Sequence, residues 1–150
     1  MVYDFFYYLT HRFVFHGKGY FRKVHAVHHQ ARSRVSSIDS FLLHPAEIFI
    51  GIALFYVVTA ILCLISGGPF HVATMVITSV IYTQLNQINH CRIDLKGFPW
   101  TTLNWIAMKH DAHHQDMHKG NYATITLLFD WLFGTLETHP LENTHGANTD

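Results

Sequence analysis

Two long apolar runs constrain the fold of this 150-residue chain more than any other feature. The first covers residues 46–65, with Glu47 near its start as its one charged residue. The second covers residues 70–88 and becomes polar toward its end. Ser-Gly-Gly-Pro at 66–69 separates the two runs and is typical of a turn. As helices, which rise about 1.5 Å per residue, both runs approach the roughly 30 Å hydrocarbon core of a bilayer.

A buried helical hairpin in a soluble protein is the alternative to a membrane-spanning pair. The remaining chain is too short to cover two such helices, since 150 residues suit a single domain. Charged residues make up 13% of the chain, about half the usual share, which also favours contact with lipid. We therefore expect an all-α fold built on an integral membrane helical hairpin. Residues 1–137 would form this domain, and residues 138–150 a polar, disordered tail.

Basic residues lie on both sides of the predicted hairpin, and none lies in its turn. They are Arg12, Lys18, Arg22, Lys23, Arg32 and Arg34 before it, and Arg92, Lys96, Lys109 and Lys119 after it. Cytoplasmic segments are enriched in Lys and Arg, so both flanks are predicted to face the cytoplasm, at a bacterial inner membrane or the endoplasmic reticulum. Lys plus Arg equals Asp plus Glu at 10 each, so the charge balance does not favour a nucleic-acid partner.

Most of the 14 histidines fall into patterns on these two flanks. Two triplets share the spacing i, i+3, i+4, and they are His25, His28 and His29, and His110, His113 and His114. Helices predicted over residues 20–30 and 100–114 would bring each triplet onto one face. His11 and His16, on a helix predicted over residues 2–15, lie about 140° apart if that helix is regular. They can share a site only if the helix distorts or ends between them, and Gly17 makes this feasible.

With His90, which follows the second apolar run, the chain offers nine imidazoles for metal binding. Nine ligands fit two ions of four or five ligands each, whereas one zinc uses three or four. Imidazole suits zinc, copper, iron and nickel alike, so ligand type leaves the metal open. Asp4, Asp111 and Asp130 could orient imidazole N–H groups from behind the ligands.

Other candidates are weaker. His118 could extend the second triplet, whereas we interpret His44, beside Pro45, as structural. Cys91 could be a thiolate ligand but is interpreted as a packed neighbour of His90, and neither cysteine belongs to a CxxC pair. Three histidines, in the turn and the tail, are left out of the predicted site, namely His71, His139 and His145.

The combined motifs resemble the fatty acid hydroxylase/sterol desaturase superfamily. They are Asp4…His11-Arg12-Phe13-Val14-Phe15-His16, His25-x-x-His28-His29, His44-Pro45-Ala46-Glu47, His110-x-x-His113-His114, Asn121-Tyr122, and the run from Asp130 to Thr135. The resemblance implies a membrane-bound, non-haem di-iron oxygenase with a cytosol-facing, histidine-rich helical cap. It implies two iron ions and O2, and hydroxylation or desaturation of a fatty acyl, sterol or carotenoid-like lipid. Electrons would come from NAD(P)H through a separate carrier, such as cytochrome b5 or ferredoxin with its reductase.

The chain departs from that superfamily in two places. Members usually carry further membrane helices before the first histidine motif, so we expect a fragment, a mis-assigned start, or a compact form that dimerises. Many members also have a histidine where this chain has Asn86, which could bind metal directly or through water. The alternatives are a membrane metal-binding or transport protein without redox turnover, a zinc hydrolase, and an inactive remnant. Transport predicts ionisable residues inside the spans, and the ligand count disfavours the hydrolase.

Overall fold

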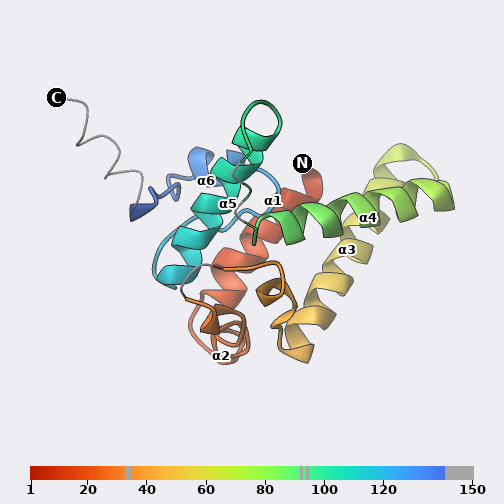
Figure 1. The fold of residues 1–150 in the computed structure, drawn as a ribbon. Coiled ribbons are helices and arrows are strands. Elements are labelled where there is room, and N and C mark those ends of the chain that lie inside the picture. The colour runs from red at the N-terminus through yellow and green to blue at the C-terminus, as the bar shows by residue number, and fades with distance from the viewer. Residues whose placement is uncertain (33–34, 92, 94, 141–150) are drawn as a thin grey trace.

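All the secondary structure in the computed structural model is helical over the residues it describes, which are 1–32, 35–91, 93 and 95–140. The elements are α1 (Val2–Leu9), η1 (Thr10–Phe15), α2 (Tyr20–His25), η2 (His28–Gln30), η3 (Asp39–Phe41), α3 (Pro45–Ser66), α4 (Val72–Ile88), α5 (Trp100–Gln115) and α6 (Leu128–Leu132) (Figure 1). The predicted all-α class is therefore confirmed. Arg34, Arg92 and residues 141–150, including His145, lie outside the described residues.

The predicted helix over residues 2–15 is present, but it changes type along its length. α1 runs directly into η1, which is a π-helix. The backbone N–H of His16 donates to the carbonyl of His11 at 3.0 Å, closing the i to i+5 ring that defines a π-turn. Gly19, with a φ of 131°, then separates this segment from α2. The distortion that the spacing of His11 and His16 required is therefore built into the backbone.

α3 forms because an apolar run is bounded by a clear start and stop. His44 caps its N-terminus by accepting a hydrogen bond from the Ala46 N–H on Nδ1, and Pro45 occupies the first turn. Gly67, in the left-handed conformation with a φ of 77°, ends the helix. With 22 residues, α3 is about 33 Å long. Of the described helices, it is the one long and apolar enough to cross a membrane.

α4 follows α3 after a short turn and covers most of the second apolar run. Both helices project from the rest of the protein and meet at their far end (Figure 1). Their apolar side chains are largely exposed, as at Phe49, 72% exposed, and Leu64, 83% exposed. An exposed apolar surface of this kind is typical of a region that contacts a membrane or another protein instead of water.

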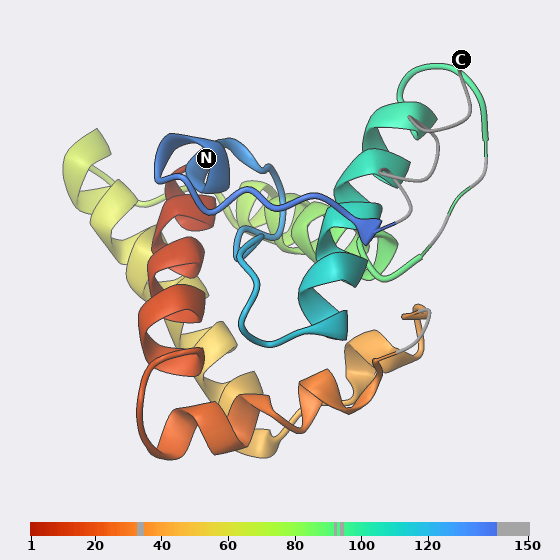
Figure 2. The same ribbon diagram turned by 90° about the vertical axis from the view of Figure 1, so that its left-hand side faces the viewer.

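The remaining helices enclose an interior that is mainly polar. α1 and α5 lie on opposite sides of it, and the chain from residue 116 to 127 passes between them (Figure 2). Eight of the nine predicted histidine ligands are buried there, together with Asp4, Asn121 and Asp130. Buried polar side chains must be paired, so the interior depends on the contacts described next.

Candidate metal centre

The structure gathers all nine predicted histidines into two groups. Group 1 is His11, His16, His25, His29 and His113, and group 2 is His28, His90, His110 and His114. Within each group, one ring nitrogen from every histidine lies within 4.8 Å of all the others. The groups have five and four members, which matches the division expected from the ligand count. Each group could hold a metal ion.

The two triplets do not each converge on one point, as helical spacing predicted. α2 ends at His25, and His28 and His29 lie in the 3-10 helix η2. His25 and His29 consequently join group 1, whereas His28 joins group 2. α5 is a regular helix, and yet His113 belongs to group 1 while His110 and His114 belong to group 2. Each triplet therefore contributes to both groups.

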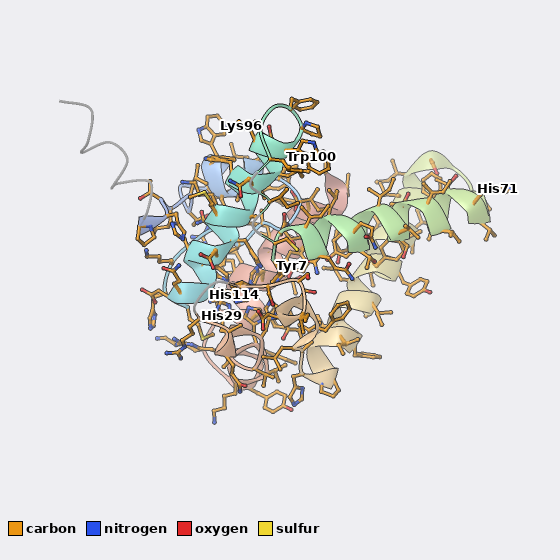
Figure 3. All side chains as sticks on the ribbon, viewed as in Figure 1. Tyr7, His29, His71, Lys96, Trp100 and His114 are labelled. Atoms are coloured by element: carbon orange, nitrogen blue, oxygen red, sulfur yellow. The ribbon has the colours of Figure 1, made fainter. Side chains whose placement is uncertain are left out.

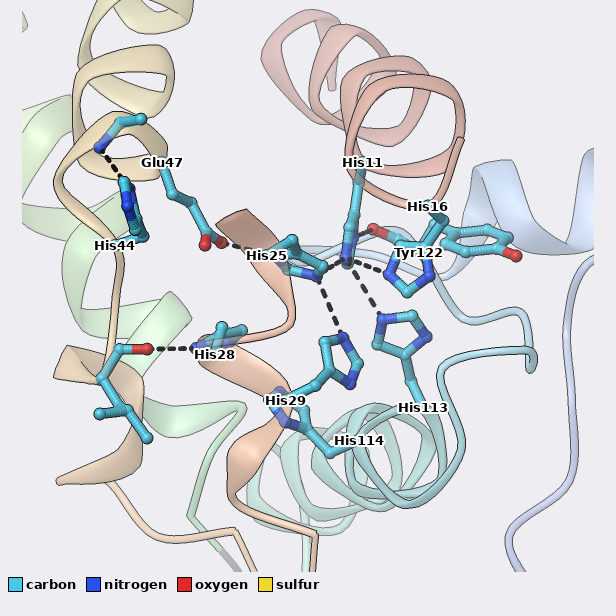
Figure 4. A network of polar contacts seen from close by, with 12 residues as sticks. His11, His16, His25, His28, His29, His44, Glu47, His113, His114 and Tyr122 are labelled. Carbon is cyan, nitrogen blue, oxygen red and sulfur yellow. Dashed lines mark hydrogen bonds and ion pairs between the residues drawn. The ribbon is translucent and has the colours of Figure 1, made fainter. Parts of the chain in front are cut away.

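Nδ1 contacts fix the tautomers of four group 1 histidines. His11 faces the Tyr122 carbonyl at 2.6 Å, His16 the Met117 carbonyl at 2.9 Å, and His113 the Gly120 carbonyl at 2.7 Å. Carbonyl oxygens can only accept, so each Nδ1 carries the proton and donates. The fourth contact joins His25 Nδ1 to Glu47 Oε1 at 2.7 Å and has the same direction when Glu47 is ionised (Figure 4). In all four rings the Nε2 atom is left with its lone pair.

These lone pairs point at one another. His11 Nε2 lies 2.9 Å from His25 Nε2 and 3.2 Å from the Nε2 atoms of His16 and His113. Two neutral acceptors cannot form a hydrogen bond, so the cluster lacks the protons that would hold it together. Nitrogens bound to one ion at about 2.0–2.1 Å lie about 2.8–3.4 Å apart at octahedral or tetrahedral angles. The observed spacing fits a shared cation.

Group 2 repeats this arrangement with fewer fixed rings. His28 Nδ1 donates to the Leu42 carbonyl at 3.3 Å, and His90 Nδ1 donates to the Asn86 carbonyl at 2.8 Å. Their Nε2 atoms are 3.2 Å apart, and His110 Nε2 lies 3.1 Å from that of His90. The buried Nδ1 atoms of His110 and His114, like that of His29 in group 1, have no hydrogen-bond partner among the described residues.

Burial keeps these imidazoles neutral. Loss of solvation lowers the pKa of His16 to about 4, and that of His113 to about 3. In group 2, burial followed by repulsion from His90 lowers the pKa of His28 to about 4. The pKa values of the other six also fall, again mainly through burial. Neutral imidazole is the form that binds a metal.

Among the described residues, Glu47 is the carboxylate in direct contact with a clustered histidine, and the sequence did not single it out for this role. It lies in the first turn of α3 and reaches His25 from there (Figure 4). The sequence signal that could have identified Glu47 was its position as a charged residue inside an otherwise apolar run, three residues after His44.

Asp4 and Asp130, which were expected to orient imidazoles, instead hold the loop that does so. Asp4 accepts hydrogen bonds from the backbone of Ile125 and Thr126. Asp130 accepts from the N–H groups of Tyr122 and Ala123, both at 2.8 Å. Tyr122 in turn offers its carbonyl to His11. The two carboxylates therefore position the histidines indirectly, through the backbone of this loop.

Asp111 pairs with a histidine that the sequence had assigned to the polar tail. His139 is 1% exposed, and its Nε2 donates to Asp111 Oδ2 at 2.9 Å. Asp111 also accepts from the Val35 N–H at 3.2 Å. The chain at His139 is thus held against α5, while the extent of the predicted tail stays a prediction.

The other candidates lie outside both groups. Asn86 uses its side-chain oxygen to accept from the Thr124 hydroxyl at 2.9 Å, and its carbonyl orients His90. His118 is exposed, and Cys91 joins neither group. His44 has the structural role expected of it. His71, at the turn between α3 and α4, lies far from His29 and His114 (Figure 3).

A cavity of about 310 Å³ opens beside group 2, between the bases of α3 and α4 and the side of α1. His28, His90 and His110 form part of its wall, so a molecule inside it would lie against this group. Its other lining residues are Tyr3, Tyr7, Phe15, Ser40, Phe41, Leu43, Glu47, Ile48, Gly51, Ile52, Tyr82, Thr83, Asn86 and Gln87.

Two buried polyhistidine groups beside a long apolar helix define a histidine-rich helical protein in which each group could hold a metal ion. Among proteins of this kind, the chain belongs to the fatty acid hydroxylase family, which matches residues 1–135. The resemblance drawn from the motifs is therefore confirmed.

Relatives in the family include enzymes of lipid metabolism. Methylsterol monooxygenase 2-2 of Arabidopsis thaliana is 32% identical over 140 residues, covering 88% of this chain and 48% of that protein. Very-long-chain aldehyde decarbonylase GL1-11 of Oryza sativa subsp. indica is 34% identical, with the same coverage. Cholesterol 25-hydroxylase-like protein 2 of Danio rerio is 31% identical, over 90% of this chain and 47% of that protein. The chain spans about half the length of these relatives. No solved structure matches it.

Proposed function

We propose that this protein is a membrane-bound di-iron oxygenase that uses O2 to hydroxylate or desaturate a C–H bond of a lipid. The observation that carries the proposal is the convergence of histidine Nε2 atoms in two groups, one of which lies on the wall of a cavity. Membership of the fatty acid hydroxylase family implies a lipid substrate. The names of the relatives support sterol or long-chain substrates.

In this proposal, group 1 holds one iron and group 2 holds the other. The iron pair supplies reductive activation of O2, with electrons from NAD(P)H through a separate carrier such as cytochrome b5 or ferredoxin. The protein's residues hold the ligands in the tautomer that exposes Nε2, through the carbonyls of residues 117–122 and through Glu47. The cavity beside group 2 would place a lipid carbon near the histidines.

We also propose that α3 and α4 span the bilayer as a hairpin and that residues 1–137 act as one membrane domain. The exposed apolar side chains of both helices support a lipid environment. The basic residues of the two flanks favour a cytoplasmic position for the histidine groups. The electron carrier would then approach from the cytoplasm.

The test is metal analysis of purified protein, followed by lipid profiling of expressing cells with and without oxygen. We expect two irons per chain and an oxygen-dependent hydroxylated or desaturated lipid. Long-chain aldehydes, supplied to the same cells, test the reaction named for the rice relatives. His28→Ala and His113→Ala should each abolish the product, while His118→Ala, at an exposed histidine outside both groups, should not. One zinc per chain with an unchanged lipid profile would overturn the proposal.

A further inference from the structure

A second cavity, of about 170 Å³, lies between α3 and α4, beyond the one that adjoins group 2. Tyr3 is the residue that lines both cavities, so it lies where the two adjoin. On one side of Tyr3 are the histidines of group 2, and on the other are side chains such as Val58, Leu62 and Met75. A linear molecule that starts beside group 2 and extends past Tyr3 would reach the second cavity.

Tyr3 is held in place by residues from two other helices. Its hydroxyl donates a hydrogen bond to the hydroxyl of Tyr82 on α4 at 3.1 Å, and the two rings meet edge to face with centroids 4.6 Å apart. On the α3 side, the ring of Phe55 lies 6.1 Å from that of Tyr3. A contact that joins α1, α3 and α4 therefore lies where the two cavities adjoin.

The two cavities differ in the ligand chemistry that they admit. The first presents polar groups, among them Glu47, Asn86 and Gln87, together with the histidines. Glu47 is 7% exposed, and its Oε2 atom has no hydrogen-bond partner among the described residues, so a polar group of a ligand could bind there. The second cavity is mostly apolar and suits hydrocarbon.

We propose that the Tyr3–Tyr82 pair is a partition that sets the maximum length of an unbranched lipid chain held beside group 2. This inference rests on the proposed function, because it assigns a lipid to the first cavity. Chains that end at the pair bind with it closed, whereas longer chains must part the two tyrosines to reach the second cavity. The pair thus determines chain-length specificity without touching the histidines.

Binding of straight-chain alcohols of increasing length, in competition with a fluorescent fatty acid, tests the partition independently of turnover. The full chain is used in lipid nanodiscs. Each methylene that gains burial adds about fourfold in affinity. Tyr82→Ala should therefore raise the affinity for chains two or more carbons beyond the wild-type limit by about tenfold or more. Tyr82→Phe, which keeps the ring and loses the hydrogen bond, should shift the limit less.

Two further variants guard against general effects of substitution. Tyr82→Trp, with a larger ring, should move the limit toward shorter chains. Tyr56→Ala, at a tyrosine of α3 that is 64% exposed and lines neither cavity, should leave it unchanged. The same length profile in the wild type, Tyr82→Ala and Tyr82→Trp would overturn the partition while leaving the proposed function intact. Failure of the wild type to bind any chain would overturn both.

Discussion

Replacing Glu47 should weaken metal binding at one group and spare the other. Its contact with His25 is 2.7 Å long, and the side chains of His25 and Glu47 are 1% and 7% exposed. Burial lowers the pKa of His25, so the contact is a hydrogen bond from neutral imidazole rather than an ion pair. Glu47→Leu would leave the Nδ1–H of His25 buried without an acceptor, and free the ring to turn away from His11.

Loss of a partner that orients a metal-bound histidine typically costs 10–100-fold in metal affinity. For Glu47→Leu we expect a loss of this size at group 1, equivalent to about 1.4–2.7 kcal/mol. Glu47→Gln retains an oxygen that can accept from His25, so its loss should be smaller. No described histidine of group 2 contacts Glu47 in the structure, so affinity at that group should change little.

Anaerobic titration of metal-depleted protein with Co²⁺, followed by its visible absorption, measures the two affinities. A His114→Ala background removes a ligand of group 2 and so identifies which binding step belongs to group 1. Asp116→Asn is the control, because Asp116 is an exposed carboxylate that accepts from the backbone of His118. Equal weakening of both steps by Glu47→Leu, or an equal effect of Asp116→Asn, would refute the assignment.

Three further predictions concern stability and the loop behind group 1. Asn121 is fully buried, has a φ of 64° and forms three hydrogen bonds through its side chain. Asn121→Ala should therefore lower the free energy of unfolding in urea by about 3–5 kcal/mol. Asn121→Gly should lower it by about 1 kcal/mol less, because glycine adopts a positive φ without strain. Gly120→Ala would drive a methyl group into the Thr135 carbonyl and displace the loop that orients His113, which should lower the thermal midpoint and weaken group 1 in the Co²⁺ titration. Metal-free protein should lose stability as the pH falls from about 6.5 toward 4, because the unfolded chain then binds more protons than the folded one, in which the pKa of His16 is about 4. Thermal melts across that range would contradict this last prediction if the midpoint stayed constant.

The helices and the membership of the site were largely predictable from local patterns. Apolar runs marked α3 and α4, and the spacing of histidines on their flanks pointed to the nine residues that the structure brings together. That these residues bind metal stays a prediction. Composition and spacing predict these features because helix formation and the pattern of histidines depend on residues that are close together in the sequence.

The division between the groups was not predictable, because it depends on how distant segments meet. A regular helix over residues 20–30 would put His25, His28 and His29 on one face, but α2 ends at His25 and a tighter helix follows. The hydrogen-bond partners of the imidazoles could not be predicted from the sequence either. Most are backbone carbonyls, which any residue supplies, and Glu47 meets His25 across 22 positions of sequence.

Neighbouring residues in the triplets serve different groups, and this limits how the chain can change in length. His28 and His29 are adjacent, as are His113 and His114, so a single peptide unit, with Cα atoms about 3.8 Å apart, links one group to the other. One residue inserted between His110 and His113 would turn the following ring by about 100° and remove a ligand from each group at once. The segments 25–29 and 110–114 should therefore not tolerate insertions or deletions. The turn at 66–71 between α3 and α4, in contrast, can vary in length.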